Sequence, residues 1–164
     1  MTTIVLGPAD ALVRALTDAV GEILVVDGDA PVADTMWRAL MALQRAHESM
    51  KATGGRIVVV LPTIGMAGAA GQVDYTTAVE GIRAMTKSAA RQWGSAGIGV
   101  NMIAAPVHLF KPDADSSHLT AAAVPDGPTL IHSVVEAAGF LLRADLTHLT
   151  GETIVVDGGS VMLP

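Results

Sequence analysis

The chain offers few side chains whose types and spacing could carry out chemistry. Tyr75 is its single tyrosine, and a tyrosine can exchange protons at neutral pH only if its pKa is lowered from about 10. That change requires about 4 kcal/mol of differential stabilisation of the phenolate. One helical turn later stands Val79, followed by the acidic Glu80, so no cation at this spacing can supply it. A packing or interface role for Tyr75 is therefore the preferred interpretation, and proton transfer is the alternative.

Other catalytic and metal-binding patterns are missing from the sequence. The histidines show no ligand spacing such as H-x-x-x-H and the chain has no cysteine, so we expect no metal site. There is no G-x-S-x-G nucleophile elbow, and Ser88 and Ser95 have no positioned base. Asp113, Asp115 and His118 could form a polar cluster, but a solvated loop is the preferred interpretation.

The composition excludes several classes of function. A net charge of −6 argues against nucleic acid as a partner, and neither a basic run nor an apolar run of ~20 residues suggests a membrane. The absence of cysteine fits our expectation of a cytoplasmic protein. Apolar residues make up 51% of the chain and charged residues only 16%, which is more apolar surface than one small domain can bury. The surplus indicates either a partner interface or an alanine-rich composition alone.

The hydrophobic pattern predicts strands that alternate with helices. Apolar runs without polar alternation predict buried strands at residues 3–6, 22–26, 56–61, 97–103 and 153–156. Apolar residues at helical spacing predict helices at 10–20, 31–51, 75–93 and 131–143. Residues 105–129 are proline-rich and polar, and form the one long irregular segment. We therefore expect residues 1–164 to form a single α/β domain, a three-layer parallel sheet with helices on both faces.

Several stretches together resemble the short-chain dehydrogenase/reductase family, in the style of its acyl-carrier-protein ketoreductases. They are GGRIVVV, Tyr75 followed by TKSAARQ, GIGVNMIAAP and LTGETIVVDGG, and the match covers residues 50–159. The resemblance implies a Rossmann-like fold and oxidation or reduction of a hydroxyl or keto group with NAD or NADP. EILVVDGD resembles the family's fourth strand, so we expect a sheet truncated to about five strands, without the family's second and third strands.

The resemblance also implies a catalytic Asn-Ser-Tyr-Lys tetrad, of which this sequence keeps only Tyr75. The family's serine falls on Pro62, its lysine on Val79 and its asparagine on Thr35, with Thr63 as a displaced hydroxyl next to the serine position. We therefore expect no catalytic residue in this chain.

The glycine-rich turn that holds the family's cofactor is also degenerate. Only Gly7 remains of it, Pro8 lacks an N–H group, and Asp10 places a negative charge where a pyrophosphate would lie. The missing strands would have carried the residue that binds the adenosine ribose. We therefore expect that this chain binds no cofactor, and that NAD or NADP is held by a partner subunit.

The elements that remain are those through which the family's enzymes assemble. One family interface pairs the two long helices, here 33–51 and 75–93, and another pairs the last helix and strand, here 131–143 and 153–156. The candidate interface residues are Trp37, Leu40, Met41, Leu43, His47, Ile82, Met85, Ala89, Trp93 and Phe140.

The first hypothesis is a pseudoenzyme, a non-catalytic subunit that supports a full-length NAD(P)-dependent dehydrogenase/reductase. The resemblance implies a hydroxy or keto substrate for that complex, such as a 3-hydroxyacyl or 3-oxoacyl thioester or a steroid. The partner is a full-length relative, or the chain itself in a dimer or tetramer. One alternative is a cofactor-independent enzyme that uses Tyr75 for proton transfer, and another is a homo-oligomeric binding or scaffold protein.

Overall fold

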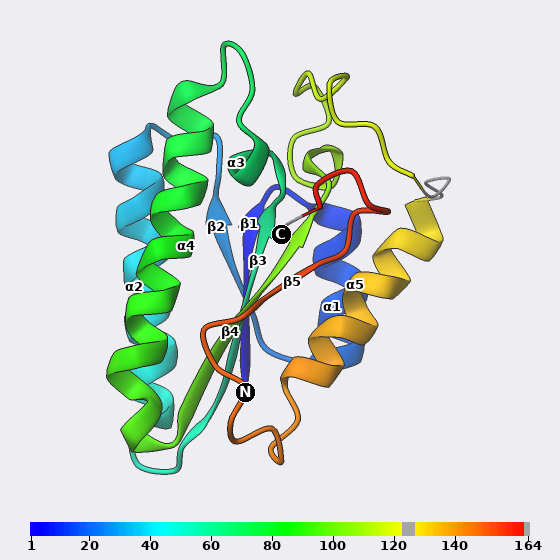
Figure 1. Cartoon of the computed structure of the whole chain (residues 1–164). Helices are drawn as coiled ribbons and strands as arrows, with labels where there is room; N and C mark the ends of the chain where they lie inside the picture. Colours follow the sequence, from blue (N-terminus) through cyan, green and yellow to red (C-terminus); the bar gives the residue numbers. More distant parts are fainter. Residues whose placement is uncertain (123–126, 163–164) are drawn as a thin grey trace.

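A single sheet of five parallel strands lies at the centre of the described chain, residues 1–122 and 127–162 of this computed structural model (Figure 1). The strands are β1 Thr2–Gly7, β2 Ile23–Asp27, β3 Gly55–Pro62, β4 Ile98–Ala105 and β5 Thr153–Val155. The helices are α1 Asp10–Val20, α2 Val32–Met50, α3 Ile64–Ala67, α4 Val73–Trp93 and α5 Gly127–Leu141, with 3₁₀ turns at Gly94–Ala96 and Val107–Leu109. The predicted α/β class and the truncated parallel sheet are confirmed.

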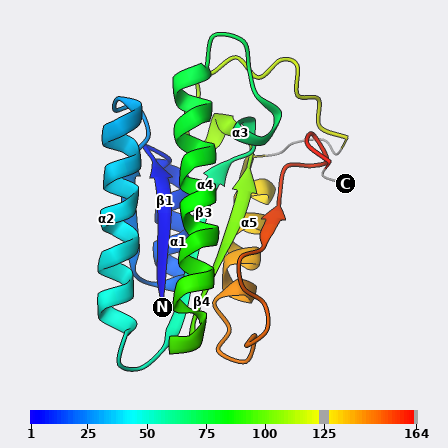
Figure 2. The ribbon, with the colours of Figure 1, turned by 60° about the vertical axis from the view of Figure 1, so that its left-hand side comes forward.

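The helices cover both faces of the sheet. Helices α2 and α4 lie side by side on one face, whereas α1 packs against α5 on the other (Figures 1 and 2). Small residues allow the first pair to approach closely: a Cβ atom on Gly81 of α4 would lie only 2.7 Å from Cε of Met36 on α2. No helix in the described part of the chain is long and apolar enough to cross a membrane.

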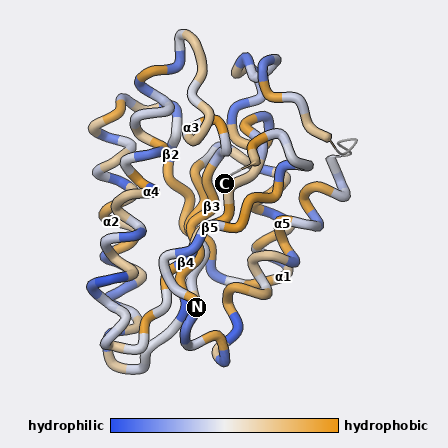
Figure 3. Tube along the Cα trace, in the orientation of Figure 1, coloured by the Kyte–Doolittle hydropathy of each residue, from blue (hydrophilic) through white to orange (hydrophobic). Residues whose placement is uncertain are grey.

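The continuous apolar runs correspond to the strands that are covered on both faces. Strands β1, β3 and β4 are buried along nearly their whole length, whereas the terminal strands β2 and β5 are only partly covered. Figure 3 shows the same distribution, with hydrophobic residues along the central strands and hydrophilic ones on the outer sides of the helices. The core therefore lies on both sides of β1, β3 and β4.

The strand order is β2-β1-β3-β4-β5, which differs from a simple removal of two strands. In the order 3-2-1-4-5-6 of dinucleotide-binding folds, a fourth strand pairs with the inner side of the first. Here β3 takes that inner position, since Thr2 pairs with Ile57, and β2 lies on the outer side of β1. The hand of the connection explains this placement. Helix α1 lies on the face of the sheet opposite α2. A right-handed crossover through α1 therefore places β2 on the outer side of β1, away from β3.

The connection from β4 through α5 to β5 has the opposite hand to the others. It advances across the sheet in the same direction as β3-α4-β4, but its helix lies on the α1 face. Left-handed crossovers of parallel strands are rare, about one in fifty. Because of this connection, the residues after β4 must pass over the carboxyl edge of the sheet to reach the α1 face.

The bounds of some elements differ from the prediction. The four-residue helix α3 was not predicted, because one turn is too short to show periodicity. Helix α5 begins at Gly127 rather than near residue 131 and ends at Leu141 rather than 143. The irregular segment 105–129 contains a 3₁₀ turn, and its residues 123–126 lie outside the described residues.

Candidate functional site

Thr63 is a buried hydroxyl at the carboxyl end of β3, directly after Pro62. Its backbone N–H donates to the Ala105 carbonyl at 2.8 Å, but its Oγ1 has no hydrogen-bond partner in the described chain. Thr63 lines a cavity of about 390 Å³, the Thr63 cavity, together with Val107, Ser133, Val156 and other residues that follow β4 and β5. Leaving a buried hydroxyl unpaired costs about 1–3 kcal/mol, and Thr63 is fully buried, so its hydroxyl is a local cost to the stability of the fold.

Tyr75 lies at the amino end of α4 and lines a different cavity, of about 610 Å³. The Lys111 ammonium lies 5.4 Å above the centre of its ring, and the same ammonium forms an ion pair of 2.6 Å with Asp29. Burial, and secondly the Asp29 carboxylate, raise the pKa of Tyr75. The structure therefore does not bring Thr63 and Tyr75 into one cavity, and it keeps the phenol protonated at neutral pH.

Lys111 is a residue near Tyr75 that sequence reasoning missed. It belongs to the segment after β4 and reaches Tyr75 only because that segment crosses the carboxyl edge of the sheet. No spacing along the chain connects the two residues, so only the tertiary fold could reveal the contact. Because the Lys111 ammonium is held in an ion pair with Asp29, it does not lower the pKa of Tyr75, which stays raised.

The raised pKa of Tyr75 predicts a pH effect of definite sign. An acid whose folded pKa lies above its unfolded value of about 10 contributes stability below pH 10, and that stability is lost as the pH rises. Titration of the single tyrosine by ultraviolet difference absorbance should therefore give a folded midpoint well above that of the urea-unfolded chain. A folded midpoint at or below the unfolded one would contradict the burial of Tyr75.

The position of the family's lysine is filled by packing. Val79 is 1% exposed, and a Cβ atom on Gly65 of α3 would lie 2.5 Å from its Cγ1. The neighbouring acid, Glu80, pairs with Arg83 on the same helix. Helix α3 therefore closes over the place from which a lysine would extend toward Tyr75.

Thr35, at the family's asparagine position, has a structural role. It is fully buried, and its hydroxyl lies 3.0 Å from the Ala30 carbonyl oxygen and 3.2 Å from that of Asp27. It thereby ties the loop after β2 to the first turn of α2. Thr35 lines neither the Thr63 cavity nor the Tyr75 cavity.

The turn between β1 and α1 does not fit a dinucleotide pyrophosphate. Gly7 leads into Pro8, which has no N–H to donate, and a Cβ atom at Gly7 would lie 2.6 Å from Val25 Cγ1. The first turn of α1 carries Asp10. A cradle for phosphate needs free N–H groups and open space above glycine, and this turn offers neither.

One feature of this edge nevertheless matches the fold of dinucleotide-binding proteins. Asp27 ends β2, the strand beside β1, about twenty residues after Gly7, where such proteins carry the acid that binds the ribose. Its carboxylate already accepts hydrogen bonds from Arg38 at 3.1 Å and from the Asp29 N–H at 3.0 Å. Strand β2 thus lies on the side of β1 where dinucleotide-binding folds have their second strand, but without a phosphate cradle the residues present do not fit the cofactor.

The predicted interface residues fall into two groups. Leu43, Ile82 and Ala89 are buried inside the chain itself, so they are corrected from interface candidates to core residues. Trp37, Met41 and Phe140 are exposed, whereas the other candidates, Leu40, His47, Met85 and Trp93, are partly buried. The rings of His47 and Trp93 stack with centroids 4.6 Å apart, which joins the ends of α2 and α4.

The polar loop residues do not form a metal site. Asp115 accepts a hydrogen bond from the Ser117 N–H at 3.0 Å, and His118 Nε2 lies 2.9 Å from the Gly68 carbonyl oxygen. No group of three or more His, Asp or Glu residues suited to a metal ion occurs in residues 1–122 and 127–162.

Comparisons with known proteins find the same family of reductases over most of this chain. A family model described as enoyl-(acyl carrier protein) reductase matches residues 24–161. The 3-oxoacyl-(acyl-carrier-protein) reductase of Vibrio cholerae is 29% identical over 181 residues, covering 94% of this chain and 73% of the relative. The Salmonella typhimurium enzyme of the same name is 32% identical over 134 residues, covering 79% of this chain and 54% of its own length.

Two further comparisons agree. Mouse (3R)-3-hydroxyacyl-CoA dehydrogenase is 28% identical over 143 residues, covering 83% of this chain and 55% of its own. The solved structure of ElxO with NADP bound superposes with a TM-score of 0.63 at 18% identity, covering 93% of this chain and 73% of that one, which supports the fold alone. The chain thus spans only about half of the length of several curated relatives that it matches.

Proposed function

Since the chain belongs to the short-chain dehydrogenase/reductase family, we propose that it is a non-catalytic subunit that supports a full-length NAD(P)-dependent relative. The observation that carries the proposal is Val79. At the position of the family's lysine, the chain has a valine sealed beneath α3. If only the lysine had been replaced, the space for its side chain would still be open. Instead, the backbone of α3 at Gly65 packs against Val79 and fills that space.

The other groups of the tetrad support the same proposal. Pro62 has no side-chain hydroxyl, Thr35 is used to hold a loop, and the pKa of Tyr75 is raised rather than lowered. A catalytic tyrosine of this kind needs the opposite shift, toward neutrality. The β1–α1 turn offers no pyrophosphate cradle, so we further propose that NAD or NADP is held by the partner and not by this chain.

Exposed apolar side chains on the long helix α2 and on α5 support assembly. Trp37 is 62% exposed on α2, and Phe140 is exposed near the end of α5. Large exposed aromatic residues are the usual anchors of protein interfaces. These two helices belong to the two surfaces through which the family resemblance implies dimers and tetramers.

The curated relatives suggest the substrate of the complex. They are named as reductases of 3-oxoacyl groups on acyl carrier protein and as a dehydrogenase of 3-hydroxyacyl-CoA. The proposed partner therefore acts on a 3-oxoacyl or 3-hydroxyacyl thioester, and a steroid is the other substrate that the resemblance allows.

Copurification tests this proposal directly. A tagged chain co-expressed with a full-length relative from the same genome should retain it, and Trp37→Glu should lower the retained amount about tenfold by placing a charge in the interface. Val73→Glu is the matched control, because Val73 is 71% exposed and is the first residue of α4, ahead of the candidate interface stretch 75–93. If no relative is retained, or if both variants retain it equally, the proposed assembly is wrong.

A second candidate function follows from the Tyr75 cavity. Tyr75, Lys111 and Asp29 line it together, and a protonated phenol can donate a proton to a bound molecule without any cofactor. Proton transfer by Tyr75 requires a pKa near the working pH. The ultraviolet titration described above therefore distinguishes this candidate from the non-catalytic subunit. A folded midpoint near neutrality would favour proton transfer over the non-catalytic subunit.

A further inference from the structure

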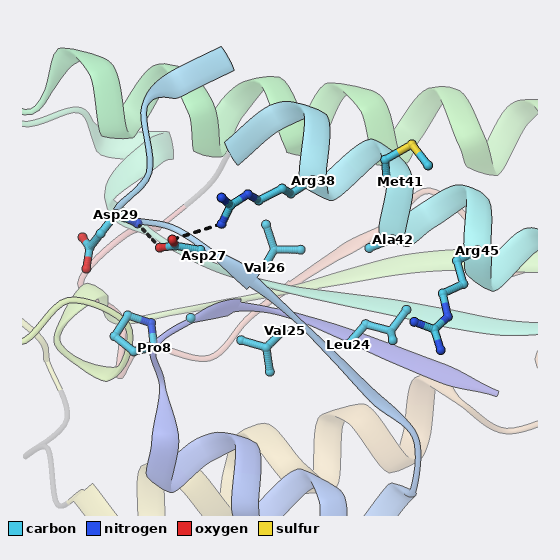
Figure 4. A pocket seen from close by; sticks show the side chains of 11 residues that line it. Pro8, Leu24, Val25, Val26, Asp27, Asp29, Arg38, Met41, Ala42 and Arg45 are labelled. Carbon is cyan, nitrogen blue, oxygen red and sulfur yellow. Dashed lines mark hydrogen bonds and ion pairs between the residues drawn. The ribbon is translucent and has the colours of Figure 1, made fainter. Parts of the chain in front are cut away.

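The outer edge of β2 forms a groove with α2 that none of the functions above uses. This β2 edge groove has a volume of about 600 Å³ (Figure 4). Its walls are apolar in the middle, where Leu24 and Val26 of the strand lie on the side of Met41 and Ala42 of the helix, whereas Val25 points to the opposite face of the sheet. Val25 is 54% exposed, a large value for an aliphatic residue at the centre of a strand.

The backbone of β2 leaves hydrogen-bonding groups available along this groove. The Thr3 N–H donates to the Glu22 carbonyl and the Gly28 N–H donates to the Gly7 carbonyl, each at 3.0 Å. Alternate residues of a strand turn their N–H and C=O groups to opposite sides, so those of Ile23, Val25 and Asp27 point away from β1. Because β2 is the terminal strand, these groups meet no further strand of the described sheet.

This edge carries little of the protection that natural edge strands usually have. Proteins blunt such edges with lysine, proline or a bulge, which prevent another strand from pairing there. The sequence of β2 is ILVVD, without lysine or proline, and its pairing with β1 is regular along its whole length. The edge is therefore open to pairing with another strand.

The charges at the two ends of the groove are opposite in sign. Asp27 and Asp29 stand at the carboxyl end of β2, whereas Arg45 lies near Leu24 toward the amino end (Figure 4). Arg38 pairs with Asp27 and Lys111 pairs with Asp29, but Arg45 forms no ion pair within the described residues. One end of the groove therefore carries two carboxylates that are already in ion pairs, and the other end carries an arginine that has no ion pair among the described residues.

We propose that a second copy of this chain occupies the groove, with the two β2 strands antiparallel about a two-fold axis at Val25. Under this symmetry the amino end of each β2 meets the carboxyl end of the other, so Arg45 of each copy faces the end of the second copy that carries Asp27 and Asp29. The outward backbone groups are centred on Val25, so the two valines form a hydrogen-bonded pair. The Asp27 carbonyl already accepts from Thr35 at 3.2 Å, and its second lone pair serves the new strand.

The side chains fit the same symmetry. Met41 is the middle residue of α2, Val32–Met50, and lies beside the centre of β2, so the two copies of Met41 meet near the axis. The pairing joins the two sheets into one and covers the exposed Val25 with its symmetry mate. Self-complementarity of this kind favours a second copy over an unrelated strand, because an isologous interface uses one surface twice.

A single cysteine tests the geometry, because the natural chain has none. In the hydrogen-bonded pair the two Val25 Cα atoms would be about 5.5 Å apart, which lies within the range that a disulfide can bridge. Mild oxidation of Val25→Cys should give a covalent dimer about tenfold faster than oxidation of the control Val73→Cys, whose thiol is exposed away from the groove. Adding Arg45→Glu to Val25→Cys should reduce this advantage several-fold.

Sedimentation of the full chain gives an independent readout. The natural chain should be a dimer at micromolar concentration and Val25→Lys a monomer, with unchanged far-ultraviolet circular dichroism. A natural chain that remains a monomer, or a dimer whose Val25→Cys variant links no faster than the Val73→Cys control, would overturn the proposal. Because the test uses this chain alone, its failure leaves the assembly with a full-length relative untouched, and the reverse also holds.

Discussion

We expect Val79→Lys to lower the free energy of unfolding by about 3–5 kcal/mol. The substitution restores the family's spacing between lysine and Tyr75, but we expect it to produce no dehydrogenase or reductase activity. Val79 is 1% exposed and lies among Leu61, Met66 and Ile103. The only acid beside it on this helix, Glu80, is already paired with Arg83. A lysine there would bury a charge without a partner or push α3 away from α4.

Urea unfolding followed by circular dichroism measures this effect. Ala84→Lys is the matched control, since it adds the same side chain to an exposed position of α4 and should change the stability by no more than about 0.5 kcal/mol. The opposite result would be a Val79→Lys protein as stable as the natural chain, with a lower pKa for Tyr75. This result would mean that the space between α3 and α4 still accommodates a lysine at position 79, and it would weaken the proposal of a non-catalytic subunit.

The elements of the fold could be predicted from the sequence because their patterns are strong. Helix α1 was predicted with the bounds that it has, Asp10–Val20, and the strands were placed within a few residues of their ends. Burial on both faces explains the uninterrupted apolar runs of β1 and β3. The exception, α3, is a single turn, and it matters because its Gly65 lies against Val79.

The strand order could not be predicted from local pattern or from family resemblance. Residues of β2 resemble a strand that would stand between β1 and β3, yet β1 pairs with β3 directly. The deciding term is the hand of the β1–α1–β2 connection, which depends on the face that α1 covers. This order gives β2 a free edge, and the proposed contact with a second copy depends on that edge.

In the candidate site, too, the sequence reveals changes at single residues but not contacts that depend on the tertiary fold. The loss of the lysine and of the glycine turn is visible in single residues, Val79 and Pro8. The contact between Lys111 and Tyr75 is not, because it depends on how the segment after β4 crosses the sheet. Helical spacing likewise marked Leu43 and Ile82 as an apolar face but could not decide whether that face meets the sheet or a partner.

Truncating Phe110 to alanine should lower the free energy of unfolding by about 3–5 kcal/mol, because Phe110 belongs to the segment that seals the carboxyl edge of the sheet. That segment starts after β4 at Pro106 and reaches Asp29, which follows β2, through Lys111. Given the strand order, it must pass over the carboxyl ends of β3 and β1. The chain leaves these two strands toward opposite faces, and doubly wound proteins bind ligands in the crevice at such a point.

The two phenylalanines of the chain provide the control for this experiment. Phe110 is 1% exposed and Phe140 is 43% exposed, so Phe140→Ala should cost less than about 1 kcal/mol in the same urea measurement. The cavity left by Phe110→Ala should also bind a small apolar ligand such as benzene, which would recover part of the lost stability. Equal costs for the two truncations would mean that Phe110 does not close the crevice. In that case the point where ligands bind in this fold would be open in the natural chain, and a ligand-binding function would gain support over a purely structural one.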